Sequence, residues 1–370
     1  MKKIYLMVLA AMTMVSCTDI VDYDEGYTPA SEIENSSAPE ITAVYDVADT
    51  EMAHPLTEGE MGQMLHLVGK NLNNLKALSF NTVEADIKET YTYGDDAYVV
   101  VPNRLSLAHD NTISYTTDKG TCSFPFIIPF PSLTVNGAEC EFVNAGDIMK
   151  VTGKNFDIYK FGEVSHITIA GKELAIENVS ADAIEFRIPD GTPDNSTITL
   201  SWEDQEGKTL MAEVPFRPTQ NLLYGDMTDM NLSKDGPVNV SKEDGYLHFT
   251  GSFDAWSWNT IDLSRNMIDV GEMGDLNDWV VKFEIMTADS YPLTEASPLQ
   301  WSFNWSKEYR WEMGTLNTHG QWRTITLPLA EMANKGIPAA GKWMTLRIIF
   351  QPTAEYDADF SIANIRIVRK

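Results

Sequence analysis

Residues Leu299–Trp311 read LQWSFNWSKEYRW, and aromatic residues alternate with polar ones through most of this stretch. A second stretch, Phe253–Trp258, reads FDAWSW and ends with two tryptophans two positions apart. Alternation at every second position predicts β-strands whose rings share one face. Such a face forms half of a sandwich core or a platform for a flat ligand. Sugar rings suit a platform, because their C–H groups lie against the negative face of an aromatic ring while their hydroxyls bond polar neighbours.

The segment 219–370, which contains both stretches, holds eight of the nine tryptophans. Its pattern predicts short strands, and no helical period is sustained beyond a turn around Leu329–Lys335. Nine short strands in one unit favour a jelly-roll-like β-sandwich. The predicted strands cover residues 221–224, 246–250, 256–263, 279–287, 299–305, 309–312, 322–328, 343–351 and 360–368.

The chain before this segment contains an internal repeat. Gly69-Lys70-Asn71 and Gly153-Lys154-Asn155 lie 84 residues apart, and each follows an alternating apolar run. A period of this length with strand-like contents indicates tandem domains, because one solenoid unit is shorter. Short alternating strands with turn punctuation predict a β-sandwich in each copy. The expected domains cover residues 39–131 and 132–218.

The strand that leads into Gly-Lys-Asn and then an apolar residue resembles the IPT/TIG family of immunoglobulin-like domains. The second copy, with Phe156 after the turn, matches better than the first, where Leu72 follows. The resemblance implies two tandem Ig-like sandwiches, in which the glycine supplies the backbone freedom that a tight turn needs. The chain is therefore expected to be all-β. We expect the two Ig-like domains to serve as a spacer that the prolines at their junctions stiffen.

The N-terminus has the layout of an export leader. Met1–Lys3 is positively charged, and Ile4–Val15 is an apolar run too short to span a bilayer as a stable helix. The run ends in Ser16 before a lone Cys17, which resembles a bacterial lipobox. The resemblance implies a signal peptide over residues 1–16, lipidation of Cys17 and a flexible, acidic tether over 17–38. The alternative is an ordinary secretory leader with an incidental cysteine.

Composition limits the classes of partner. The net charge is −27, so the surface repels phosphate backbones and no nucleic-acid partner is expected. The same charge repels anionic glycans, which favours a neutral polysaccharide, although an acidic surface also simply keeps a secreted protein soluble. Besides Cys17, only Cys122 and Cys140 are present. They could pair in an oxidising compartment, but two buried thiols are the favoured interpretation.

The C-terminal segment resembles the glycan-binding domain of surface glycan-binding lipoproteins from polysaccharide-utilisation loci of the starch-utilisation type, specifically the xyloglucan-binding type. The resemblance implies a non-catalytic lipoprotein on the outer membrane that faces the cell exterior. It further implies a β-glucan ligand such as xyloglucan or mixed-linkage β-glucan, and as partners a TonB-dependent transporter with its lipoprotein lid. The matching stretches are Gly245–Phe249, Trp279–Glu284, Tyr309–Glu312, Gly320–Leu329 and Asp359–Ile367.

The family places its ligand across aromatic side chains on one exposed face. Trp256 and Trp258 correspond best by position, and their neighbours offer little to bury. Trp279, Trp322 and Trp343 are expected in the core or at its rim, because buried rings are the commoner outcome. For Trp301, Phe303 and Trp305 of the first stretch, a place in the core is at least as well supported as a place on a platform. The full set of predicted glycan-binding residues is Trp256, Trp258, Trp301, Trp305, Tyr309 and Trp311, with Asn304 and Glu312 as hydrogen-bonding groups.

Two other functions remain open at this stage. A jelly-roll glycoside hydrolase needs two carboxylates that face each other across a cleft, and the sequence does not pair the nearest acids, Glu284, Glu308 and Glu312. A structural or adhesive surface protein would bind another protein through an apolar patch. No cofactor is indicated. A structural calcium ion is an alternative for Asp275, Asp278, Asp357 and Asp359, but no EF-hand spacing exists and these acids are interpreted as turn residues, so no metal site is predicted.

Overall fold

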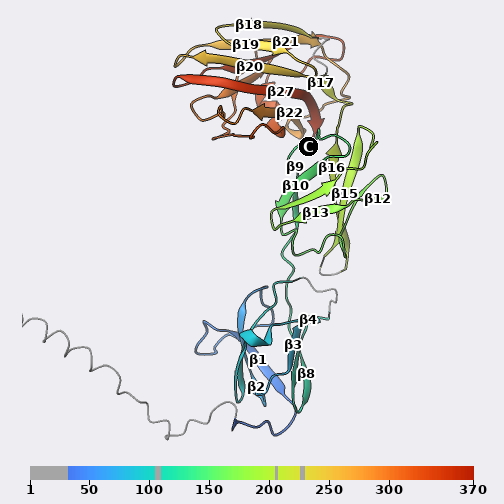
Figure 1. Cartoon of the computed structure of the whole chain (residues 1–370), viewed down its shortest axis with the longest axis vertical. Coiled ribbons are helices and arrows are strands. Elements are labelled where there is room, and N and C mark those ends of the chain that lie inside the picture. Colours follow the sequence, from blue (N-terminus) through green and yellow to red (C-terminus); the bar gives the residue numbers. More distant parts are fainter. Residues whose placement is uncertain (1–31, 105–109, 205–206, 226–229) are drawn as a thin grey trace, which may run out of the picture. The chain divides into compact units, whose positions relative to one another are not determined.

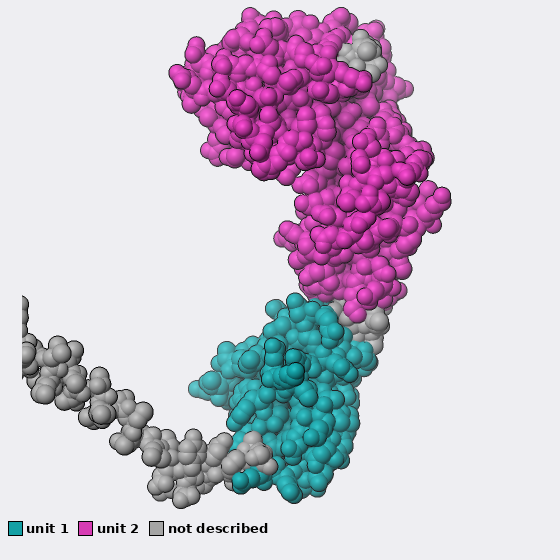
Figure 2. Space-filling view, viewed as in Figure 1, with its two compact units in different colours: residues 1–130 teal, residues 131–370 magenta. Residues whose placement is uncertain are grey.

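The structure is a computed structural model that describes residues 32–104, 110–204, 207–225 and 230–370. The leader, Cys17 and the first part of the predicted tether lie outside the described residues. The chain divides into two compact units, Met1–Phe130 and Pro131–Lys370 (Figure 2). The described residues form antiparallel sheets with very little helix, which confirms the all-β prediction (Figure 1). Within these ranges no helix is long and apolar enough to cross a membrane.

The first unit is a sandwich of two four-stranded sheets. Strands with alternating burial, such as β7 with its buried Ile113 and Tyr115, turn one face inward and one to solvent. Leu65 and Leu67 meet them from the other sheet in one shared core. One sheet has the order β1 (Glu40–Asp46), β2 (Met64–Lys70), β6 (Asp96–Val100), β5 (Tyr91–Tyr93). The other has the order β4 (Val83–Glu84), β3 (Ala77–Phe80), β7 (Thr112–Thr117), β8 (Gly120–Pro125), and a short 3-10 helix, η2 (Ile87–Glu89), joins the sheets.

The second unit begins with a sandwich of the same plan, as the sequence repeat predicts. One sheet has the order β13 (Ile176–Val179), β14 (Ala183–Arg187), β10 (Ile148–Lys154), β9 (Thr134–Ala138). The other has the order β12 (Lys172–Glu173), β11 (His166–Ile169), β15 (Ser196–Glu203), β16 (Thr209–Phe216). Read from β9 to β13, the first of these sheets corresponds strand for strand to the sheet β1, β2, β6, β5 of the first unit. The second corresponds in the same way to the sheet β4, β3, β7, β8, so the two copies share one topology as well as one motif.

The Gly-Lys-Asn motif has the same geometry in both copies. A Cβ on Gly69 would lie 1.9 Å from the backbone oxygen of Glu40, and a Cβ on Gly153 would lie 1.9 Å from that of Thr134. The left-handed backbone falls instead on the asparagines, with φ of 58° at Asn71 and 68° at Asn155. The expected reason for the glycine was therefore wrong. Glycine is needed because the neighbouring strand approaches too closely for any side chain, and the asparagine makes the turn.

The C-terminal segment forms a larger sandwich. Its six-stranded sheet consists of β19 (Asn239–Lys242), β20 (Tyr246–Phe253), β27 (Tyr356–Arg369), β22 (Trp279–Thr287) and β25 (Arg323–Pro328), with β17 (Leu222–Tyr224) paired to β27. Its five-stranded sheet has the order β18 (Asn231–Asp235), β21 (Asn259–Asn266), β26 (Trp343–Phe350), β23 (Leu299–Phe303), β24 (Tyr309–Arg310). Two short helices, η3 (Leu276–Asp278) and α2 (Leu329–Met332), lie in the connections.

Aromatic rings join the two sheets of this sandwich. The ring centroid of Phe283 on β22 lies 4.6 Å from that of Trp301 on β23. The Phe253 and Phe350 rings meet edge to face at 4.8 Å, again from opposite sheets. Such pairs contribute about 0.5–1.5 kcal/mol each beyond the area that they bury. The rings therefore fix how the five-stranded sheet sits on the six-stranded one.

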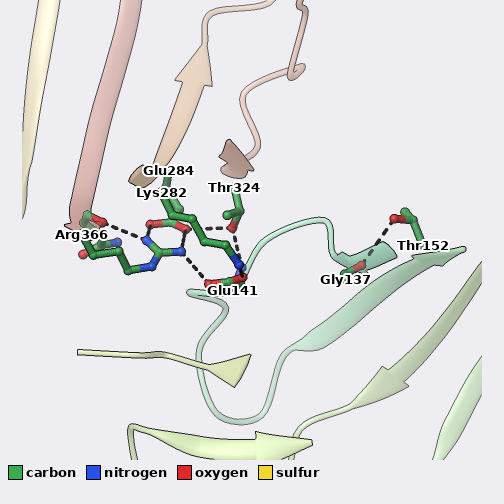
Figure 3. Close-up of polar contacts among 8 residues, drawn as sticks. Gly137, Glu141, Thr152, Lys282, Glu284, Thr324 and Arg366 are labelled. Carbon is green, nitrogen blue, oxygen red and sulfur yellow. Dashed lines mark hydrogen bonds and ion pairs between the residues drawn. The ribbon is translucent and has the colours of Figure 1, made fainter. Parts of the chain in front are cut away.

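A buried cluster of charges joins the second Ig-like sandwich to the terminal one (Figure 3). Arg366 on β27 donates to Glu141 of the Ig-like domain at 2.6 Å and to both carboxylate oxygens of Glu284 on β22 at 3.0 Å. Lys282 donates to the other oxygen of Glu141 at 2.5 Å, and the Arg366 guanidinium lies 4.9 Å from the ring centre of Phe142. Two carboxylates meet two cations, so the cluster is neutral. Pro131–Lys370 is accordingly one compact unit.

Backbone bonds add to this junction. The Glu141 N–H donates to the Thr324 hydroxyl at 2.8 Å, and the Thr324 N–H donates to the Glu139 carbonyl at 2.8 Å. The Thr324 hydroxyl in turn donates to Glu284 at 2.8 Å. The segment between β9 and β10 is thus hydrogen-bonded to β25 and, through Thr324, to β22. This arrangement fixes the terminal sandwich relative to the Ig-like domain that precedes it.

Candidate functional site

Four tryptophans of the terminal sandwich are exposed. The exposed fractions are 64% for Trp256, 48% for Trp258, 52% for Trp305 and 54% for Trp343. Exposure of so large a ring leaves apolar surface in water, which is unfavourable unless a ligand or partner covers it. Trp343 lies on a strand of the five-stranded sheet, and the other three lie on loops that adjoin a strand of this sheet.

The outer face of the five-stranded sheet is polar. Strand register places Asp262, Arg347 and Ser302 opposite one another on β21, β26 and β23. The next row along, one residue away and therefore on the opposite face, contains Ile261, Ile348 and the buried Trp301. The sheet thus turns apolar side chains inward and carries Asp262 and Arg347 on its outer side, where Ser302 and Ile349 are themselves buried.

Arg347 is held in place on this face by a bidentate ion pair. Its guanidinium donates to both carboxylate oxygens of Asp262, at 2.7 and 2.8 Å. These hydrogen bonds raise the pKa of Arg347 above its usual range, so the side chain stays charged. The Arg347 guanidinium also lies 5.7 Å from the ring centre of Trp305, within reach of a cation–π contact. The result is a fixed donor group beside an exposed aromatic ring.

Trp305 is held out by a tight turn. Asn304 and Trp305 have φ of 47° and 54°, and the Ser306 N–H donates to the Phe303 carbonyl at 2.9 Å. Two successive left-handed residues make a hairpin turn of the primed kind. Left-handed backbone costs a non-glycine residue about 1–2 kcal/mol. The turn is retained because Asn304 pairs with Thr345 twice, through its backbone N–H and through its side-chain oxygen, both at 2.9 Å.

Trp256 and Trp258 project from the loop between β20 and β21. The strand predicted over 256–263 begins only at Asn259, so neither ring belongs to a strand face. Trp256 has φ of 66°, and its N–H donates to the Pro352 carbonyl at 2.7 Å. Buried Asn259 anchors the end of the loop, because its side chain accepts from the Val238 N–H at 3.2 Å and donates to the Phe350 carbonyl at 3.0 Å. The loop holds both rings outside the core.

The exposed tryptophans stand at opposite ends of the polar face. Trp258 directly precedes Asn259, which pairs with Phe350 at one end of β26. Trp343 begins β26 at the other end and pairs with Asn266, near the Asn304–Trp305 turn that is bonded to Thr345. Phe350 and Trp343 are seven residue positions apart along the extended strand, which corresponds to about 24 Å. The face between the two ends is long enough for an extended ligand.

The structure corrects several residue predictions. Trp301 is fully buried against Phe283, so the prediction that it lines a platform is wrong. Tyr309 lies opposite Trp301 in the sheet, and Trp311 meets Phe283 edge-on at 5.8 Å, so both half-buried rings pack against the core. The Asn304 side chain is committed to the turn. Glu312 is exposed.

The three tryptophans that were expected in the core or at its rim differ in their observed burial. Trp279 is buried and donates its indole N–H to the Met273 carbonyl at 2.5 Å, as a core residue should. Trp322 is half-buried, edge-on to Tyr246 at 5.7 Å. Trp343, expected in the core or at its rim, is exposed. Strand β26 reads WMTLRIIF, in which Trp343, Thr345 and Arg347 share one parity. The charge on Arg347 was the signal in the sequence for an outward face here.

The acids considered for hydrolysis do not form a pair. Glu284 lies inside the junction on the six-stranded sheet, where burial raises its pKa against the lowering influence of Arg366. Glu308 and Glu312 are exposed and lie next to β24 of the five-stranded sheet. Within the described ranges, no three or more His, Cys, Asp or Glu side chains are grouped so as to hold a metal ion. The side chains on the outer face of the five-stranded sheet are suited to ring stacking and hydrogen bonding.

These features define the class: two Ig-like sandwiches followed by a larger sandwich with a polar, tryptophan-bearing face. Residues 195–369 match the family model described as the surface glycan-binding protein B xyloglucan binding domain, and residues 131–216 match the IPT/TIG domain. The C-terminal domain therefore belongs to the surface glycan-binding protein B family, and an IPT/TIG domain precedes it. The match to the IPT/TIG model lies on the second repeat, and the first repeat shares its strand order.

One solved structure supports the fold. The surface glycan-binding protein PbSGBP-B from Prevotella bryantii is 16% identical, with a TM-score of 0.55 over 90% of this chain and 99% of its own. SGBP-B from a complex xyloglucan utilization locus in Bacteroides uniformis is 17% identical, with a TM-score of 0.49 over 90% of this chain and 100% of its own. No curated protein matches the sequence.

Proposed function

We propose that this protein is a non-catalytic surface protein that binds a neutral polysaccharide on the outer face of its five-stranded sheet. The observation that carries the proposal is the set of four exposed tryptophans around a polar face, with Trp305 beside the Arg347–Asp262 pair. Stacked sugar rings would cover the indoles, and the polar side chains between them would bond sugar hydroxyls. Trp256, Trp258 and Trp305 form the proposed platform, and Trp343 extends it.

The family assignment supports a β-glucan as the ligand. The matching model is named for xyloglucan, so xyloglucan or a mixed-linkage β-glucan is our choice of glycan. The net charge of −27 supports a neutral polymer over an anionic one, because like charges repel. Stacking on open rings with a few hydroxyl contacts gives modest affinity, in the range of about −4 to −8 kcal/mol, or millimolar to micromolar. Many copies on one cell would raise the avidity.

We place the protein on the cell surface, as its family name states for the relatives. The leader over residues 1–16 and Cys17 support a lipid anchor in the outer membrane, with residues 17–38 as the tether. In this arrangement the glycan site faces the exterior and delivers polysaccharide to a TonB-dependent transporter and its lipoprotein lid.

Affinity electrophoresis through gels that contain single neutral polysaccharides tests the function. Retardation by a β-glucan, with no release of reducing sugar from the same polymer, is the expected result. Release of reducing ends would show that the protein hydrolyses the polymer and would contradict a non-catalytic binding role. Unchanged migration on every polysaccharide would leave a protein-binding surface as the better account of the exposed rings.

A further inference from the structure

A row of four rings crosses one sheet of the first Ig-like sandwich. Strand register places one ring on each of β1, β2, β6 and β5, in the order Tyr45, His66, Tyr98 and Tyr91. The ring centroids of His66 and Tyr98 lie 4.4 Å apart in a stacked pair, and the Tyr91 centroid lies 6.3 Å from that of Tyr98. The Tyr45 centroid lies 6.4 Å from that of His66. Three strand spacings give this ring row a length of about 14 Å.

The ring row lies on the outer face of its sheet. Its members on β2 and β6 alternate with Leu65, Leu67 and Val99, which are buried in the core. His66 is buried although it points away from the core, because it lies between two neighbouring rings of the row. Tyr91, on the edge strand β5, is 55% exposed. The row therefore presents aromatic surface to solvent.

The second Ig-like sandwich shows that this fold does not require the rings. Gly153 corresponds to Gly69, so Lys150 on β10 occupies the position of His66 on β2. Read from β9 to β13, the equivalent row in the second sandwich consists of Glu139, Lys150, Glu185 and Asn178. All four are polar, and Lys150 forms an ion pair with Glu139 at 3.5 Å. The same topology thus forms with a charged row, so the rings of the first sandwich are not needed to build the sheet.

The polar groups of the ring row suit a hydroxyl-rich ligand. The three tyrosine hydroxyls of the row make no hydrogen bond to the part of the chain that the structure describes. The next row along the strands consists of Tyr93, Asp96, Val68 and Ala43. Its one charged side chain, Asp96, is bonded to His66 Nε2 at 2.7 Å. Neither row contains a lysine or an arginine, so an anionic glycan would find no counter-charge there and a neutral one is favoured.

The size of this face favours a sugar chain over a protein partner. A third row, with Met64 opposite Val100, extends the apolar surface on the other side of the rings. The three rows together cover about 14 Å by 14 Å, or about 200 Å². A stable protein interface takes about 800 Å² from each partner. An apolar protein surface would also bury the tyrosine hydroxyls without partners, whereas sugar hydroxyls would bond them.

We propose that the ring row is a second binding face for a neutral polysaccharide, separate from the face on the terminal sandwich. The proposal goes beyond the proposed function, because it gives the first Ig-like domain a part in glycan capture in addition to its part as a spacer. The rings of the row are smaller than indoles, so we expect a dissociation constant of about 1 mM. The tryptophan platform accordingly governs retardation of the chain in a gel.

Saturation-transfer difference NMR with cellohexaose, a linear neutral β-glucan oligosaccharide, tests the inference because it detects millimolar binding. The platform-free chain carries alanine in place of the four exposed tryptophans, which are Trp256, Trp258, Trp305 and Trp343. This chain should still transfer saturation to the sugar protons. The row variant gives the platform-free chain the residues of the second sandwich, with the substitutions Tyr45→Glu, His66→Lys, Tyr98→Glu and Tyr91→Asn. It should lose the signal.

Two single substitutions in the platform-free chain keep the test decisive if the row variant fails to fold. Tyr91→Asn replaces only the exposed ring at the edge of the sheet, and should reduce the signal about threefold with an unchanged melting temperature. Tyr291→Asn replaces an exposed tyrosine of the terminal sandwich and is the matched control. It should leave the signal as it is in the platform-free chain.

The outcomes separate the inference from the proposed function. A signal from the wild-type chain that is absent from the platform-free chain overturns the second face alone, and a protein contact would then be the better account of the ring row. A signal from the platform-free chain that survives Tyr91→Asn and a folded row variant also overturns it. Absence of any signal from the wild-type chain overturns the proposed function and the inference together.

Discussion

Glu141 of the second Ig-like domain and Arg366 of the terminal sandwich lie 2.6 Å apart, oxygen to nitrogen, and both side chains are buried. They are 225 residues apart in sequence. Burial works to lower the pKa of Arg366, but the charges of Glu284 and Glu141 outweigh it and hold the pKa above its usual range. The guanidinium therefore stays charged and ties two domains together. The proposed glycan site on the terminal sandwich therefore has a rigid support.

Removal of Glu141 should loosen this junction. Glu141→Ala leaves Arg366 with Glu284 and Lys282 without its partner, so we expect a loss of about 3 kcal/mol in the unfolding free energy of unit Pro131–Lys370. Urea denaturation followed by tryptophan fluorescence measures it. Glu139→Ala is the control, because Glu139 makes partly exposed ion pairs with Lys150 and Arg323 at 3.5 and 3.3 Å, and should cost less than about 1 kcal/mol. Equal losses in the two variants would show that the buried cluster contributes no more to the unfolding free energy than partly exposed ion pairs do.

Two of the glycines in the second Ig-like domain, Gly153 and Gly171, should respond differently to substitution by alanine. Gly153→Ala puts a methyl group 1.9 Å from the Thr134 carbonyl, which must move and break strand pairing, so we expect a loss of about 3 kcal/mol. Gly171→Ala meets nothing within 4 Å, and only its φ of 75° opposes it, at about 1 kcal/mol. Thermal melting of both variants gives the comparison. A Gly153→Ala protein as stable as Gly171→Ala would contradict the close approach.

Trp301 and Trp305 should differ in stability effects although they lie four residues apart. Trp301→Ala empties a fully buried site and should destabilise the terminal sandwich by about 3–5 kcal/mol. Trp305→Ala removes a half-exposed ring and one cation–π contact, and should cost less than about 1 kcal/mol. Differential scanning calorimetry distinguishes the two. A small effect of Trp301→Ala would mean that the ring is not part of the core.

The thiols should be unreactive in the folded protein. Burial raises the pKa of Cys140 to about 12, and burial also raises that of Cys122. Because the thiolate is the reactive form, a raised pKa lowers its fraction at pH 8, and both thiols should react far more slowly than a free cysteine. Ellman's reagent on a Cys17→Ala chain measures this, with the urea-unfolded chain as the reference. Rapid reaction of two thiols at pH 8 without denaturant would be inconsistent with these environments.

The fold could be predicted from the sequence because strands and turns are determined by patterns that extend over only a few residues. The Gly69–Asn71 and Gly153–Asn155 motifs predicted two equivalent sandwiches, and the strand orders agree. The platform residues were harder to predict. Trp301, Phe303 and Trp305 share one parity, so alternation alone places all three on one face. The strand ends at Phe303, and the left-handed turn at Asn304 then sends Trp305 outward while Trp301 stays in the core.

The polar part of the site depends on contacts that no local pattern contains. Asp262 and Arg347 are 85 residues apart and meet only because β21 pairs with β26. In the same way, Glu284 looked like a strand acid beside the aromatic region, yet tertiary packing places it inside the junction. Period-two alternation identifies the two faces of a strand. Which face is covered depends on the partner sheet.

The most direct test of the account is the mobility of three variants in a gel that contains the β-glucan that retards the wild-type chain. Trp256→Ala/Trp258→Ala should lose retardation, and Trp305→Ala should bind about three- to tenfold more weakly, as expected for one lost stacking contact. Trp322→Ala is the control and should be retarded as wild type, because its half-buried ring directly precedes β25 of the six-stranded sheet and packs edge-on against Tyr246. Retardation that persists in the double variant and in Trp305→Ala, with every fold intact, would contradict a ligand on the outer face of the five-stranded sheet.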